Sequence, residues 1–225
     1  LLSETITNSR EGLTFKIDET NKTASLFNVK KNIKELIVPR TVEYNSTEYL
    51  ITSIIKTGLY LETIKFSEDS AVKTFYGKAF SSSKIEEIHF PASLKELKEG
   101  WYYGLDYLKK IIISPSNDQF KFIDNKYLIG KSDSNNTEFD TLLYVRRNNN
   151  EFSIPSNIKI ISSYVFIYRR NLTKIEIPTN SNLQTIESDA FSSSNIESIF
   201  IPSKVTKICE YAFSFCRNLT KVEIP

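Results

Sequence analysis

A repeated phrase is the feature that most limits what this chain can fold into. The chain ends on RNLTKVEIP (217–225), and RNLTKIEIP stands at 170–178. Proline closes the phrase and recurs at Pro178, Pro202 and Pro225, at intervals of 23 or 24 residues. A unit of this length cannot bury an apolar face alone, so it has to stack on its copies. The repeat therefore predicts a solenoid.

Each repeat contains a short strand that ends at its proline. The apolar residues follow the pattern apolar-x-x-apolar-x-apolar, as in Ile196, Ile199 and Ile201 before Pro202. The final alternation is typical of a strand, and proline ends the strand because it has no N–H to donate. Such short strands pair with their counterparts in neighbouring coils, about 4.8 Å away, which predicts parallel β-sheet.

The second half of each repeat contains a small residue followed by Phe, as in Ala79-Phe80 and Ala190-Phe191. We expect this pair to form a tight turn that places the aromatic ring in the core. Trp101-Tyr102 occupy the same slot in one repeat, and Gly58-Leu59 occupy it in the most divergent one.

Two segments interrupt the repeat. Residues 1–32 contain GLTFKID (12–18) and TASLFNV (23–29), which predict a β-hairpin that caps the first coil. In residues 116–150, FKFIDNKYLIG (120–130) and TLLYVRR (141–147) predict a second, inserted hairpin joined by KSDSNNTEFD.

We therefore expect a single domain over residues 1–225. It divides into a cap (1–32), repeats (33–115), the hairpin insertion (116–150) and further repeats (151–225). The chain stops at Pro225 in phase with the repeat, so we expect more coils to follow it in a longer protein. It contains no Met and starts at Leu1, so we also expect its natural start, and any signal peptide, to be missing.

The charge balance and the cysteines restrict the classes of partner and ligand. Twenty-nine basic and 27 acidic side chains leave a net charge of +2, which predicts no nucleic-acid partner, and no apolar run is long enough to predict membrane insertion. Cys209 and Cys216 form either a disulfide, if the protein is secreted, or two buried thiols that act as small hydrophobes. With a single His in the chain, they cannot complete a four-ligand zinc site unless carboxylates help, and we expect no metal or cofactor.

The repeat phrase resembles a known family. The order L-x-x-I-x-I-P, V-x-x-I, A-F and then Cys before the next Leu is similar to the BspA-like leucine-rich-repeat proteins, and residues 202–225 match best. The resemblance implies a curved, right-handed leucine-rich-repeat β-solenoid with short parallel strands, an N-terminal hairpin cap and one inserted hairpin. It also implies a cell-surface or secreted protein that attaches to host cells, to matrix proteins or to neighbouring cells.

The residues between the inward apolar positions of each strand point outward and stack from coil to coil. A mixed apolar and charged row of this kind is typical of a protein-binding surface, although it also fits ordinary exposed sheet residues chosen for solubility. This outward ladder consists of Glu35, Ile37, Thr63, Lys65, Glu87, His89, Lys110, Ile112, Lys174, Glu176, Ser198, Phe200, Lys221 and Glu223.

We expect no enzymatic activity. His89 replaces Lys, Glu or Ile at an outward position, whereas a catalytic triad needs His beside a nucleophile and a carboxylate. Glu86 and Glu87 are adjacent on a strand and point to opposite sides, so they do not form an acid pair. The glycines form no phosphate-binding loop.

Five N-x-S/T sequons occur, at Asn21, Asn45, Asn135, Asn171 and Asn218. Asn45 and Asn135 lie in predicted polar loops and are the best candidates for glycosylation in a eukaryotic source.

The sequence predicts an adhesion or protein-binding module with a protein ligand, which is a host-cell protein, a matrix protein or another copy of itself. An intracellular repeat scaffold and a passive spacer stalk are the alternatives.

Overall fold

The structure is a computed structural model. It describes residues 4–8, 12–30, 32–81, 83–147 and 150–225, and for residues 4–8 it describes the backbone only. The chain forms two compact units, Leu1–Asp118 and Gln119–Pro225. We call them the first and second units and describe each by itself. The described residues contain strands, turns and bends but no helix.

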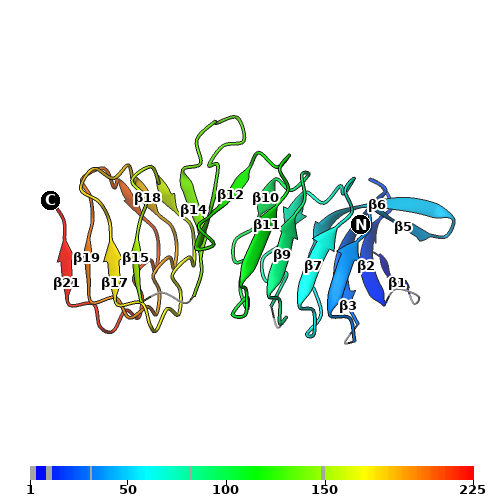
Figure 1. Cartoon of the computed structure of the whole chain (residues 1–225), viewed down its shortest axis with the longest axis horizontal. Helices are drawn as coiled ribbons and strands as arrows, with labels where there is room; N and C mark the ends of the chain where they lie inside the picture. The colour runs from blue at the N-terminus through cyan, green and yellow to red at the C-terminus, as the bar shows by residue number, and fades with distance from the viewer. Residues whose placement is uncertain (1–3, 9–11, 31, 82, 148–149) are drawn as a thin grey trace. The chain divides into compact units, whose positions relative to one another are not determined.

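The first unit contains a four-stranded parallel sheet with one strand from each coil, shown side by side in Figure 1. Equivalent residues of neighbouring strands lie side by side, with Leu36 beside Ile64 and Ile64 beside Ile88. The strands are β4 (Glu35–Val38), β7 (Thr63–Phe66), β9 (Glu87–Phe90) and β11 (Lys110–Ile113). This arrangement confirms the predicted solenoid with short parallel strands.

A second sheet in the first unit runs from the N-terminal segment into the second half of each coil. The predicted cap hairpin is confirmed, because β2 and β3 pair antiparallel from Leu13–Val29 to Asp18–Thr23. The sequence analysis did not predict strand β1 or the β5–β6 hairpin. The strands are β1 (Glu4–Asn8), β2 (Leu13–Asp18), β3 (Thr23–Val29), β5 (Thr41–Tyr44), β6 (Thr47–Ile54), β8 (Thr74–Phe75) and β10 (Glu96–Leu97).

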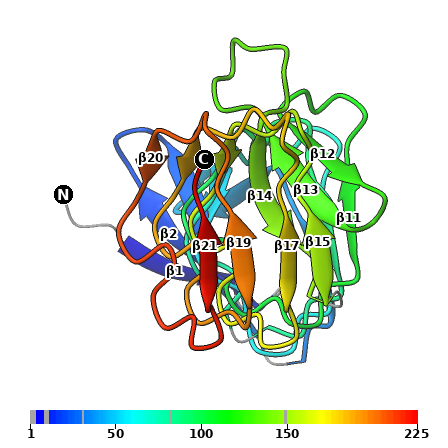
Figure 2. The ribbon, with the colours of Figure 1, turned by 90° about the vertical axis from the view of Figure 1, so that its left-hand side faces the viewer.

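The second unit repeats the two-sheet arrangement, and Figure 2 shows its first sheet side by side. That sheet consists of β15 (Glu151–Ser153), β17 (Lys174–Glu176), β19 (Ser198–Phe200) and β21 (Lys221–Glu223). The other sheet consists of β12 (Phe120–Ile123), β13 (Tyr127–Gly130), β14 (Thr141–Val145), β16 (Ile160–Ile161), β18 (Thr185–Ile186) and β20 (Lys207–Ile208).

The inserted segment differs in detail from the predicted hairpin. Residues 120–130 do not form one arm, because the chain reverses at Asp124 and Asn125, which both have positive φ. β12 and β13 therefore form a tight hairpin, and β13 then pairs antiparallel with β14 across the loop 131–140. Three turn residues, 124–126, join the two strands, and the Lys126 N–H donates to the Ile123 carbonyl. Asp and Asn suit the first two positions because they tolerate positive φ. The insertion is a three-stranded meander whose last strand joins the parallel sheet through β16.

The register also shows which residues occupy the proline position. Phe90 pairs with Ile113, so Ser114 lies beside Pro91, and Pro115 lies one residue further on. Val38 pairs with Phe66, so Ser67 occupies the position of Pro39 in its own coil. Serine thus replaces proline in two coils of the first unit.

Aromatic side chains fill the core at the predicted slot. In the second unit Phe166, Phe191 and Phe213 stack nearly parallel, with ring centroids 4.9 and 5.1 Å apart. In the first unit Phe80 and Trp101 are buried and meet edge to face at 6.4 Å. The predicted slot at Gly58-Leu59 is not filled in this way, because the Leu59 side chain is 48% exposed.

The turns around these aromatic residues impose a left-handed backbone. The residue before the small slot residue has positive φ at Lys78, Tyr164, Asp189 and Tyr211, and Gly100 stands there in the Trp101 repeat. A second positive φ follows two residues after the aromatic one, at Tyr168, Ser193, Phe215 and Gly104. Non-glycine residues disfavour this conformation, so the surrounding coil contacts compensate for the strain.

Candidate protein-binding face

The first unit places the predicted outward residues on one face of the β4-β7-β9-β11 sheet. In β4, Glu35 and Ile37 are exposed while Leu36 and Val38 are buried. The same positions in the next strands are partly or fully exposed, and their neighbours Ile64, Ile88 and Ile111 are buried. We call Glu35, Ile37, Thr63, Lys65, Glu87, His89, Lys110 and Ile112 the first outward ladder.

The charges of the first outward ladder pair with one another, both within a strand and between neighbouring coils. Lys65 Nζ lies 2.5 Å from Glu35 Oε1, and Glu87 contacts His89 Nε2 at 2.7 Å and Lys110 Nζ at 3.5 Å. The hydrogen bond to Glu35 raises the pKa of Lys65, and the hydrogen bond from His89 holds the pKa of Glu87 below its usual range. Surface pairs of this kind contribute only about 0–1 kcal/mol each to stability.

The first outward ladder also contains two apolar residues, which lie among the paired charges. Ile37 is 59% exposed, and Ile112 is partly exposed beside His89. Pairing of the neighbouring charges lowers the electrostatic penalty of covering them with another protein. The face therefore combines exposed apolar groups with charges that are already paired.

The second unit presents a second outward ladder. Lys174, Ser198 and Lys221 lie in register on β17, β19 and β21, and Phe200 lies beside Glu223. The Lys221 ammonium contacts the Glu223 carboxylate. Glu176 is exposed on β17, and Phe200 is partly exposed.

Sequence reasoning missed two members of the second ladder. Strand β15 places Glu151 beside Lys174 and Ser153 beside Glu176, with Lys174 Nζ 4.0 Å from a Glu151 oxygen. The alternation Glu-Phe-Ser-Ile at 151–154 could have predicted this strand. Phe152 and Ile154 are its buried residues, so Glu151 and Ser153 face outward. Val222 on β21 and Ile224 just after it are exposed, although the pattern assigns both inward. In the described part of the chain, β21 pairs with β19.

A hollow of about 270 Å³ opens where β7, β9 and β11 end, next to the first outward ladder. We call it the strand-end hollow. His89 and Ile112 belong to both the ladder and its lining. The other lining residues come from the same phase of three coils and are Phe66, Ser67, Glu68, Phe90, Pro91, Ala92, Ile113, Ser114 and Pro115.

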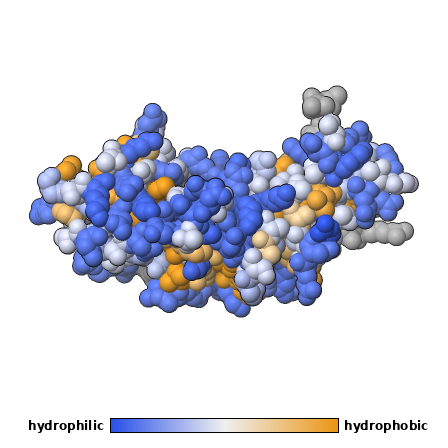
Figure 3. All heavy atoms as spheres, turned by 90° about the horizontal axis from the view of Figure 1, so that it is seen from above, coloured by the Kyte–Doolittle hydropathy of each residue, from blue (hydrophilic) through white to orange (hydrophobic). Residues whose placement is uncertain are grey.

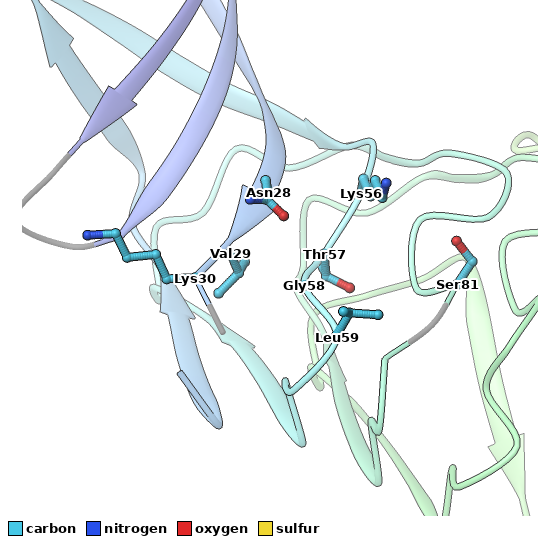
Figure 4. A pocket seen from close by; sticks show the side chains of 8 residues that line it. All are labelled: Asn28, Val29, Lys30, Lys56, Thr57, Gly58, Leu59 and Ser81. Atoms are coloured by element: carbon cyan, nitrogen blue, oxygen red, sulfur yellow. The ribbon is translucent and has the colours of Figure 1, made fainter. Parts of the chain in front are cut away.

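A second hollow, of about 390 Å³, lies between the end of β3 and the divergent Gly58-Leu59 slot. Figure 4 shows its side chains, which come from Asn28–Lys30, Lys56–Leu59 and Ser81. The Lys30 side chain extends away from Gly58 and Leu59, and Thr57 donates its hydroxyl hydrogen to the Ala79 carbonyl. This hollow exists because Leu59 points outward where other coils place an aromatic ring in the core.

The two predicted glycosylation positions are exposed turn residues. Asn45 has positive φ in the turn between β5 and β6, and Asn135 lies in the loop between β13 and β14, which projects beyond the coils in Figure 2.

Cys209 and Cys216 are free thiols and are partly rather than fully buried. Cys216 packs against the hydrophobic core of the second unit, and its Sγ lies 3.1 Å from the Phe191 carbonyl oxygen.

The described residues lack two further kinds of feature. No group of three His, Cys, Asp or Glu side chains among them is placed to hold a metal ion. Within the same residues, no helix has the length and apolar character needed to cross a membrane. On the face drawn in Figure 3, hydrophilic residues predominate and hydrophobic residues form small groups.

Comparison with protein families decides the identity of the repeat. A model of the BspA type leucine rich repeat region, in six copies, matches residues 23–139 and 137–225. The chain belongs to the BspA-type leucine-rich-repeat family. The family and the fold are those of a repeat module for protein–protein interaction. No curated protein sequence matches the chain significantly.

Solved structures resemble this chain to different degrees. A leucine-rich repeat protein from Eubacterium ventriosum matches with a TM-score of 0.58 and 20% identity, over 100% of this chain and 73% of that one. The pneumococcal vaccine antigen PcpA matches with a TM-score of 0.43 and 15% identity, over 99% and 82% of the two chains. A leucine rich cell surface protein from Faecalibacterium prausnitzii has a TM-score of 0.40 and 15% identity, over 100% and 95%.

Proposed function

We propose that this chain is an adhesion module of a cell-surface or secreted protein and that it binds host proteins, matrix proteins or neighbouring cells through its outward ladders. The observation that supports this most directly is the in-register row of exposed strand positions, which contains Ile37 at 59% exposure among paired charges. Membership of the BspA-type family supports a protein partner and a surface location.

The proposal can be tested by capture of partners on the immobilised chain. The variant Lys174→Glu/Phe200→Ala/Lys221→Glu reverses two charges and removes the apolar member of the second ladder. We expect it to lower the affinity for matrix proteins or epithelial cells at least roughly tenfold, since a few apolar and charged anchors dominate most interfaces. Surface plasmon resonance and cell-adhesion counts measure the effect.

The matched control changes the other sheet of the same unit. Lys207 is exposed on β20, and Lys207→Glu reverses one charge away from the ladder. We expect this control to bind as the unchanged chain does. Equal binding by the ladder variant and the control excludes the second ladder as the contact face. Ile37→Ala with Ile112→Ala then tests the first ladder in the same assay.

The surface location has its own test. Antibodies against the chain should label intact cells of the source organism, and protease treatment of those cells should remove the label. Labelling only after permeabilisation would support the intracellular scaffold instead.

A passive spacer is the second candidate function, favoured by the charge pairs that the first ladder forms within itself. A spacer requires length and not surface chemistry. Replacing the repeats by an unrelated solenoid of equal length therefore distinguishes the two: adhesion persists for a spacer and is lost for a binding module.

A further inference from the structure

One residue that lines the strand-end hollow has a side-chain hydroxyl without a hydrogen-bond partner. Ser67 lines the hollow, and its Oγ is buried with no hydrogen-bond partner among the described residues. Buried hydroxyl groups are almost always hydrogen-bonded, so an exception points to a partner supplied from outside. Serine changes χ1 between staggered rotamers at small cost, and such a rotation turns the hydroxyl toward a group that enters the hollow.

The hollow has a clear origin in the repeat. Ser67, Pro91 and Ser114 lie side by side at the position that proline occupies in most coils. The two serines have no ring, and Ala92 has a small side chain, so the three coils leave space that prolines and larger side chains would fill. The walls combine apolar groups, from Pro91, Ile112 and neighbouring residues, with a comparable share of polar groups.

The charge at the rim of the hollow is negative. Glu68 is exposed and forms no ion pair with another described residue. The nearby acids are already engaged, because Asp69 pairs with Arg40 and Glu87 pairs with His89 and Lys110. The free charge therefore favours a basic segment.

We propose that the strand-end hollow is a socket for one tyrosine side chain, presented by a basic segment of the partner protein. This inference rests on the proposed function and specifies the partner's anchor. A volume of about 270 Å³ is slightly below the usual range for drug-sized ligands and suits a single side chain. Tyrosine fits both requirements, since its ring covers apolar walls while its hydroxyl needs a buried partner such as Ser67 Oγ.

Short peptides test the socket on the whole chain. Acetyl-Lys-Tyr-Lys-amide should shift the backbone amide resonances of Ser67, Ala92 and Ile112 saturably in ¹⁵N-correlated spectra. The Phe peptide should bind roughly three- to tenfold more weakly, because it lacks one hydrogen bond. The Ala peptide should cause no saturable shift, and acetyl-Glu-Tyr-Glu-amide should bind more weakly than its lysine counterpart.

Three variants identify the groups involved. Ser67→Ala should remove the difference between the Tyr and Phe peptides, and Glu68→Gln should weaken the basic peptides without removing that difference. Ala92→Trp should fill the hollow and abolish binding. Glu43→Gln removes an exposed carboxylate on β5, outside both the ladder and the lining, and should leave the affinity unchanged. Unshifted amides elsewhere in the spectrum show that each variant is folded.

The outcomes separate this inference from the proposed function. Equal affinity for the Tyr and Phe peptides, or shifts that lie outside the hollow, overturn the socket. If Ala92→Trp still captures partner proteins and the ladder variants do not, the socket is wrong and the adhesion function stands. If the peptide binds at the hollow but no protein or cell is captured, the adhesion function is wrong and the peptide site stands.

Discussion

Gly58 and Gly100 are glycines for different physical reasons. A Cβ atom at Gly58 would lie 2.1 Å from the Val29 carbonyl oxygen, which belongs to the backbone and cannot move aside easily. Gly100 has open space around it but a φ of +71°, where other residues are strained. Space is therefore the constraint at the first position and backbone conformation at the second.

We predict that Gly58→Ala destabilises the first unit by roughly 3 kcal/mol or more, and Gly100→Ala by about 1 kcal/mol. The first change forces coil and cap apart, whereas the second adds left-handed strain that lower entropy of the unfolded chain partly offsets. Urea unfolding followed by circular dichroism measures both. A larger loss for Gly100→Ala would contradict this assignment of causes.

The sequons also differ residue by residue. Asn45 and Asn135 are exposed in turns, whereas the Asn21 side-chain amide donates to Asp18 Oδ2 at 2.8 Å. When the chain is secreted from a eukaryotic host, we predict glycans at Asn45 and Asn135 and lower occupancy at Asn21. Peptide mass spectrometry measures the occupancy, with Asn45→Gln and Asn135→Gln as controls that remove one glycan each.

At the scale of elements, one buried carboxylate holds the inserted loop 131–140. The Asp140 side chain is 2% exposed, accepts hydrogen bonds from the Ser132 N–H and hydroxyl at 2.9 and 3.0 Å, and lies 3.3 Å from Lys159 Nζ. Burial raises the pKa of Asp140, but these hydrogen bonds and the lysine outweigh burial and hold it below its usual value. The ionised carboxylate therefore joins the two ends of the loop, Ser132 and Asp140, and attaches them to Lys159, the residue before β16.

This lowered pKa predicts a pH dependence with a definite sign. Because the folded pKa lies below the unfolded value of about 3.9, the stabilisation is complete above that value and is lost as the pH falls through the folded pKa. Asp140→Asn should cost about 1–3 kcal/mol near neutral pH. The difference in unfolding free energy between the two proteins should shrink toward acid pH, and a constant difference would contradict the tether.

The elements that sequence reasoning predicted well are those with strong alternation. The spacing of Ile196, Ile199 and Ile201 predicted both a strand and the residues that face the core. The residues between them were therefore predicted to face outward. The two-residue strands such as β18 were missed because two residues cannot show a period of two. The hollow was missed because its shape depends on how the side chains of three neighbouring coils pack, which the repeat pattern does not give.

The charge pairs of the ladder could not be predicted for another reason. They depend on long side chains that choose among rotamers and among partners in two neighbouring coils. Glu87 illustrates this, because it contacts His89 on its own strand and Lys110 on the next. Sequence alone gave the position of Glu87 and not its partners.

At the scale of the whole molecule, each unit has its own core. The Phe166-Phe191-Phe213 stack belongs to the second unit, and Phe80 and Trp101 belong to the first. Repeat proteins gain stability mainly from contacts between neighbouring coils, so damage to one core need not spread through the chain. The prediction of a single domain over 1–225 can be tested on this basis.

We predict that Phe191→Ala destabilises the second unit by about 3–5 kcal/mol and leaves the first unit nearly unaffected. Phe213→Ala, at a partly exposed ring, should cost less. Hydrogen exchange with mass spectrometry measures protection in Leu1–Asp118 and Gln119–Pro225 separately. Equal loss of protection in both would show that the chain unfolds as one cooperative domain.

The stacked rings of the second unit also restrict how such a chain can evolve. Each phenylalanine meets the next about one coil away, and a shift of one residue would turn every strand side chain to the opposite side. An added residue is therefore excluded from the strand and phenylalanine positions of a coil, although turns accept it, whereas copying or deleting a complete coil preserves these positions. The near-identical phrases at 170–178 and 217–225 have the form that such copying leaves behind.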